Sequence, residues 1–240
     1  MKRFDLYYLF LLIILFYEAG LSGMPDNDCQ KENLSFFRQD VTEKQLLFNG
    51  VVWRNLYPHV RGNQFLFTND FIKGSVTIEG KRFPDLRLKY DIYNDQVLAI
   101  NEKNIMIQLN REMVDSFSLD YNSRMYRFGK VENDSTESPR GFVNVLCDGP
   151  VSLVVKYRKE ILLHAVENTY DLFSQIQKVY VRKEGVYHPV TFRRDLFKVF
   201  GDSKKEVKNY LRSKKIRISV KDPDTIVPVI QYYNNLISAR

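Results

Sequence analysis

The fold is decided by residues 74–110, which read GSVTIEGKRFPDLRLKYDIYNDQVLAINEKNIMIQLN. Apolar and polar side chains alternate along residues 86–93: Leu86, Leu88, Tyr90 and Ile92 share one face, and the opposite, polar face carries Arg87, Lys89, Asp91 and Tyr93. Alternation with a period of two is typical of a half-buried β-strand. We therefore predict an antiparallel meander whose strands are 74–80, 86–93, 96–100 and 105–110, joined by turns at 81–85, 94–95 and 101–104.

The dipeptide Asn94-Asp95 predicts a two-residue hairpin turn, since Asn and Asp tolerate positive φ better than other non-glycine residues. Asp91 and Asp95 could instead form a pair of catalytic carboxylates. The turn position favours the backbone role for Asp95. Residues 96–100 are apolar on both faces, so we expect this strand to be covered on both sides.

Two further hairpins are predicted closer to the C-terminus. Asp148-Gly149 separates the apolar runs 141–147 and 151–157, and residues 183–185 separate 179–182 from 186–190. Residues 47–191 are thus predicted to form an antiparallel β domain, with a half-barrel or a sandwich-like sheet.

A helical period replaces the strand period after residue 191. Leu196, Phe197 and Phe200 suit a short helix, and Asp202 or Ser203 can cap a second helix. Thr225 is the expected N-cap of a third helix with an apolar stripe. The predicted class is α+β and mainly β, with two to three helices in residues 192–240 that pack on the sheet.

The N-terminus has the order of a secretory signal peptide. Lys2 and Arg3 precede an apolar run at residues 6–17, and small residues follow at 19–23. We predict a signal peptide at 1–23, a polar leader at 24–46, and export to the periplasm or the outer envelope. Retention of the apolar run as an anchor is the alternative.

Two cysteines, Cys29 and Cys147, are present. An exported chain could join them in a disulfide, and a pair of free thiols is the alternative. The three histidines are far apart in sequence, and we find no HExxH, Walker A or GxGxxG motif. The sequence predicts no catalytic residue, no metal site and no cofactor.

Charge is concentrated near the C-terminus. Residues 178–217 hold 13 Lys or Arg against four Asp or Glu, in a chain of net charge +7. We predict a helical basic face that contacts an anionic surface, formed by Lys204, Lys205, Lys208 and Arg212. A solvated face that aids solubility is the alternative. Nucleic acid fits the charge but not the export signal.

Three segments together resemble uncharacterised exported cell-envelope proteins of Bacteroidota. They are LRLKYDIYNDQVLAI at 86–100, GFVNVLCDGPVSLVVKYRKEI at 141–161 and residues 178–236. The resemblance covers roughly residues 70–238 and implies no established activity.

We therefore expect a non-enzymatic envelope protein that acts through protein or membrane-surface contacts. Two alternatives stay open. One is a carrier of a lipid or other apolar ligand in a half-barrel cavity lined by residues such as Leu98, Ile100 and Phe117. The other is an enzyme with an unrecognised site.

Overall fold

The structure is a computed structural model that describes residues 41–132, 138–166 and 169–239. The chain divides into one compact unit of residues 1–45 and a second of residues 46–240. The described part of the first unit is helical. The predicted signal peptide, its cleavage site near residues 22–23, and most of the polar leader lie outside the described residues.

The second unit contains an open antiparallel sheet, and eleven strands of it fall within the described residues. Their order in space is β1-β5-β4-β3-β2-β6-β7-β8-β9-β10-β11. The bounds are β1 Gly50–Val52, β2 Ile72–Ile78, β3 Lys81–Asp91, β4 Gln96–Ile100, β5 Met106–Leu109, β6 Val114–Tyr121, β7 Arg124–Val131, β8 Gly141–Cys147, β9 Val151–Val166, β10 Tyr170–Lys183 and β11 Val186–Val190. The predicted class, mainly β with an antiparallel meander followed by helices, is confirmed.

Five helical segments follow the sheet. Their bounds are α3 Arg193–Val199, η1 Gly201–Ser203, α4 Lys204–Ser213, η2 Pro223–Ile226 and α5 Val227–Ser238. The segments η1 and η2 are single 3₁₀ turns that lead into α4 and α5. The 3₁₀ turn η2 occupies residues 223–226, so α5 begins only at Val227 and its N-cap is Ile226. The prediction of Thr225 as the N-cap is therefore wrong. The Thr225 hydroxyl instead donates to the Asp222 carbonyl at 2.6 Å.

The turn predicted at residues 81–85 belongs to strand β3 instead. The chain reverses at Glu79-Gly80, where φ is 48° and 78°. Pro84 and Asp85 then form a β-bulge, because both residues lie opposite the single residue Ser75. A bulge accommodates a proline, which cannot donate to the ladder.

The loop after β3 is longer than the predicted two-residue turn, since Asp91 pairs with Gln96 and leaves residues 92–95 between the strands. The Asp91 carboxylate closes this loop by accepting hydrogen bonds from the backbone amides of Tyr93 and Asn94, at 3.0 and 2.9 Å. Gln64 donates to the same carboxylate at 2.7 Å. Asp91 is 1% exposed, so its role is structural.

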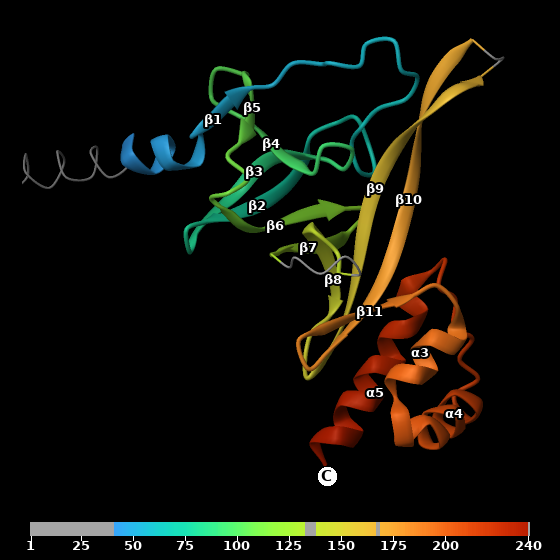
Figure 1. The fold of residues 1–240 in the computed structure, drawn as a ribbon. Helices are drawn as coiled ribbons and strands as arrows, with labels where there is room; N and C mark the ends of the chain where they lie inside the picture. The colour runs from blue at the N-terminus through green and yellow to red at the C-terminus, as the bar shows by residue number, and fades with distance from the viewer. Residues whose placement is uncertain (1–40, 133–137, 167–168, 240) are drawn as a thin grey trace, which may run out of the picture. The chain divides into compact units, whose positions relative to one another are not determined.

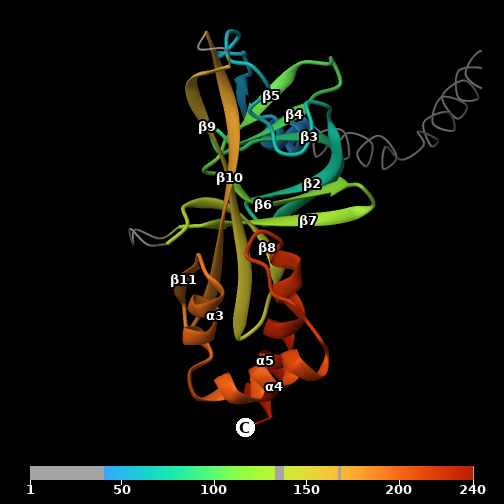
Figure 2. The same ribbon diagram turned by 90° about the vertical axis from the view of Figure 1, so that its right-hand side faces the viewer.

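Two large cores and a small third cluster of Val143, Val154 and Tyr180 stabilise the second unit. One covers the apolar face of β2–β8, where the rings of Tyr90, Phe117, Phe128 and Phe142 pack with centroids 4.5 to 6.2 Å apart. The other lies between β8–β11 and the C-terminal helices. In Figure 1 the helices lie beside one end of the long β9–β10 pair, and Figure 2 shows the same arrangement from the side.

Two side chains hydrogen-bond helix α5 to the sheet: Tyr233 accepts from Lys183 of β10 at 3.1 Å, and Asn234 binds the backbone of Val151. The Asn234 amide donates to the Val151 carbonyl at 2.8 Å and accepts from the Val151 amide at 2.9 Å. This pair of bonds satisfies the backbone at the start of β9, just after the predicted Asp148-Gly149 turn. The helices therefore have fixed positions against the sheet, and so do the basic residues that they carry.

Candidate functional site: a basic groove on the C-terminal helices

A hollow of about 700 Å³ lies between α3, α4 and the segment that follows α4. Seven cationic side chains line it: Arg193, Arg194, Lys204, Lys208, Arg212, Lys215 and Arg217. Phe197, Leu211 and Ile216 complete the lining. We call this hollow the basic groove.

The structure places three of the four predicted contact residues in the basic groove. Lys204, Lys208 and Arg212 follow one another at intervals of four, which puts them on one face of α4. Lys205 is also exposed but is not part of the lining. The spacing of Val207, Tyr210 and Leu211 predicts one apolar face of α4, in which Val207 and Leu211 are buried and Tyr210 is half-buried.

The other four cations were missed because they come from outside α4. Arg193 and Arg194 begin α3, and Lys215 and Arg217 follow the end of α4. The one signal for them in the sequence is the local excess of Lys and Arg. That excess shows that cations are numerous in this segment, but it does not show that they lie on the same surface. Packing of α3 and α4 on one core brings them to the same groove.

An aromatic ring forms part of the floor of the groove. The Arg193 guanidinium lies 5.5 Å from the centroid of the Phe197 ring, and the Lys208 ammonium lies 5.6 Å from it. Cations at this distance are attracted by the ring, which helps to hold them along the groove. Just before α3, Phe192 is 56% exposed, and the Arg194 guanidinium lies 4.9 Å from its ring centroid.

The charge in the groove is largely uncompensated. None of the described residues that line it is acidic. Arg194 of the lining pairs with Asp195 at 4.0 Å, and Asp195 also lies 3.4 Å from Lys198, which does not line the groove. Asp195 also accepts the Phe192 amide at 2.8 Å, and this hydrogen bond lowers the pKa of its carboxyl. Like charges confined in a concave surface raise the local potential and attract anions.

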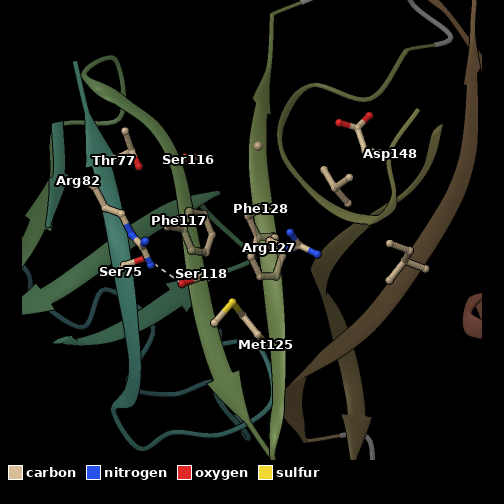
Figure 3. Close-up of a pocket in the computed structure, with 13 residues that line it drawn as sticks. Ser75, Thr77, Arg82, Ser116, Phe117, Ser118, Met125, Arg127, Phe128 and Asp148 are labelled. Carbon is tan, nitrogen blue, oxygen red and sulfur yellow. Dashed lines mark hydrogen bonds between the residues drawn. The ribbon is translucent and has the colours of Figure 1, made fainter. Parts of the chain in front are cut away.

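A second hollow, of about 510 Å³, lies over the polar face of β2, β6 and β7 (Figure 3). Its floor carries the hydroxyls of Ser75, Thr77, Ser116 and Ser118, and the first and last of these are hydrogen-bonded at 2.9 Å. Two arginines, Arg82 and Arg127, contribute the positive charge. With fewer cations than the basic groove, this hollow is the weaker anion site.

The residues proposed to line an apolar cavity are packed in the fold, and Phe117 also borders the second hollow. Leu98 and Phe117 are buried, and the Phe117 ring stacks on Phe128 at 4.5 Å. Ile100 is half-buried. Among the residues that the structure describes, no group of three His, Cys, Asp or Glu gathers in a way that could hold a metal ion.

Cys147 is a half-buried free thiol whose pKa is raised by burial. The second cysteine, Cys29, lies outside the described residues. No helix in the described ranges is long and apolar enough to cross a membrane.

Comparisons of the chain with protein-family models, with curated proteins and with solved structures found no match. What the basic groove can bind follows from its own charge and shape.

Proposed function

We propose that this chain is an exported, non-enzymatic envelope protein that attaches to anionic membrane surfaces through the basic groove. The observation that carries the proposal is the lining, in which seven cations and no acidic side chain surround a hollow of about 700 Å³. Lipid phosphates could enter between α3 and α4 and meet several of these cations together. The expected export supports the proposal, because an exported chain meets phospholipid surfaces.

The surroundings of the groove favour a lipid surface over a purely polar anion. Phe192 is exposed beside Arg193 and Arg194, and aromatic residues next to basic ones are typical of protein surfaces that lie in the membrane interface. Each cation near an anionic membrane contributes roughly 1 kcal/mol, and this attraction decays within about 8 to 10 Å at physiological salt. Such attachment is reversible and sensitive to salt.

Vesicle co-sedimentation tests the proposal. The chain from residue 24 onward is mixed with phosphatidylglycerol vesicles at low and at high salt, with phosphatidylcholine vesicles as the neutral comparison. We expect binding to the anionic vesicles alone and release at high salt. The double variant K204Q/K208Q removes two charges from the groove and should bind about tenfold or more weakly.

The matched control is K205Q/K214Q, which removes two exposed charges of the same helical region that do not line the groove. Phe192→Ser tests the apolar contribution and should weaken binding further without changing the net charge. Equal losses for the two double variants would exclude the groove as the site. Binding to neutral vesicles that is indifferent to salt would exclude the electrostatic mechanism.

A further inference from the structure

A second cluster of charges lies on the side of β9 that faces away from the C-terminal helices. Its centre is Asp95, whose carboxylate accepts hydrogen bonds from Lys156 at 2.7 Å, Arg111 at 2.9 Å and Tyr90 at 2.5 Å. Lys156 also donates to the Phe142 carbonyl at 2.9 Å and is only 7% exposed. Three segments of the chain, around residues 90–95, 111 and 156, therefore meet at one half-buried carboxylate.

The backbone is shaped to admit this cluster. Gly141 has a φ of 77°, and a Cβ atom there would lie 1.7 Å from the Asp95 carboxylate and 2.6 Å from the Arg111 guanidinium. The space of a side chain is thus occupied by the ion pair. Gly141 adopts the positive φ that the chain needs here, and its missing side chain leaves room for the carboxylate of Asp95 and the guanidinium of Arg111.

A hollow of about 510 Å³ opens beside the cluster, and its charge exceeds what Asp95 can balance. Five cations line it, Arg111, Arg140, Lys156, Arg158 and Lys178, and Asp95 is the one acidic residue among the described residues of the lining. Lys156 and Lys178 are direct partners on β9 and β10, a placement in which like charges destabilise a sheet. Burial lowers the pKa of Lys156; Asp95 acts against this shift, and Arg111 and Arg158 add smaller contributions that lower it.

Two exposed cations of this hollow, Arg158 and Lys178, have no counter-ion in the described part of the chain. Neither Arg158 nor Lys178 makes an ion pair with a described residue, and both are exposed at the mouth. Tyr180, which is buried, lines the wall next to them. Two exposed cations, Arg158 and Lys178, beside the hydrogen-bonded Lys156 and Arg111 form a geometry suited to an oxyanion, because arginine and lysine can donate to several oxygens of one group.

We propose that this hollow is a binding site for a compact oxyanion, a phosphate or a sulfate group carried by a small molecule, held by Arg158 and Lys178 in front of the Asp95–Lys156–Arg111 cluster. The bound group neutralises the facing lysines of β9 and β10. The site is distinct from the basic groove, which lies on α3 and α4.

Isothermal titration calorimetry on the full chain, with inorganic phosphate, inorganic sulfate, glucose 1-phosphate and glucose, tests the proposal. We expect saturable binding of one phosphate or sulfate per chain and none of glucose. Tighter binding of glucose 1-phosphate than of inorganic phosphate identifies a phosphorylated small molecule as the ligand, and preference for sulfate identifies a sulfate ester.

The variant R158Q/K178Q should weaken binding about tenfold or more, which corresponds to about 1.4 kcal/mol. Its matched control, K205Q/K214Q, removes the same charge from exposed positions that line neither hollow and should leave phosphate binding unchanged. Circular dichroism of R158Q/K178Q establishes that the exposed substitutions leave the fold intact. The absence of saturable binding, or equal losses for the two double variants, would overturn the proposal without bearing on attachment to vesicles.

Discussion

The ammonium group of Lys156 lies 2.7 Å from the carboxylate of Asp95, in a site where the lysine is almost entirely buried. The two residues are 61 positions apart and belong to a loop after β3 and to strand β9. Removing one partner of a buried ion pair leaves the other charge without compensation, which costs more than the pair itself contributes.

Asp95→Ala should therefore lower the free energy of unfolding by about 3–5 kcal/mol, because Lys156 and Arg111 would face each other without a carboxylate. Lys156→Met should cost less, since Asp95 retains Arg111 and Tyr90 as partners. Urea denaturation of both variants measures the difference. A smaller loss for Asp95→Ala than for Lys156→Met would show that the carboxylate does not organise the cluster.

Gly141→Ala should be strongly destabilising, because its Cβ would lie 1.7 Å from the Asp95 carboxylate. Gly185→Ala is the matched control. The φ at Gly185 is 79°, close to the 77° of Gly141, but no atom lies within 4 Å of the added Cβ. Backbone strain alone costs about 1–2 kcal/mol in the left-handed region, and this is the expected loss for Gly185→Ala. Thermal denaturation showing similar losses at the two positions would contradict the steric argument.

Stability should depend on pH through Lys156. Burial lowers the pKa of Lys156 in the folded chain, whereas in the unfolded chain its ammonium keeps the proton up to about pH 10.4. Between these two pKa values the unfolded state binds more protons, so the Lys156 contribution becomes more favourable to folding as pH rises. Below the folded pKa, the cost of burying the charged form is present in full.

The comparison of wild type with Lys156→Met isolates this effect, since the other buried lysines are common to both chains. The free energy of unfolding of wild type, relative to the variant, should increase from neutral pH toward about pH 10. Urea titrations at a series of pH values measure it. A relative stability that stays constant or falls over this range would contradict the burial of a charged Lys156.

Lys89 tests the two faces of β3. The alternating pattern predicts a solvent-facing lysine, yet Lys89 is 8% exposed, with its ammonium 4.7 and 4.6 Å from the ring centroids of Phe65 and Phe71. Lys89→Asp should cost several kcal/mol, because a carboxylate would face both rings, whereas Lys89→Met should be tolerated. Arg87→Asp, at an exposed position on the same face of the strand, is the control and should cost about 0.5 kcal/mol or less. Equal thermal shifts for the two Asp variants would refute this packing.

The sequence alone determined the meander, its later hairpins and the apolar stripes of the helices. Each of these depends on residues close together in the chain, through alternation along strands, turn dipeptides such as Asp148-Gly149, and the 3.6-residue period of α4 and α5. It also indicated the cations of α4, since a spacing of four residues places them on one face.

Only the tertiary structure decided which charged side chains are buried and which of them contact each other. Lys89 is buried because the loop before β2 folds over the polar face of β3, a contact made by residues about 20 positions away. Asp95, which the sequence marks as a turn residue, gains a second role from Lys156 and Arg111. The basic groove likewise needs α3 packed beside α4. Periodicity reports which side of an element is apolar, but only the packing of distant segments determines which charges meet and which are buried.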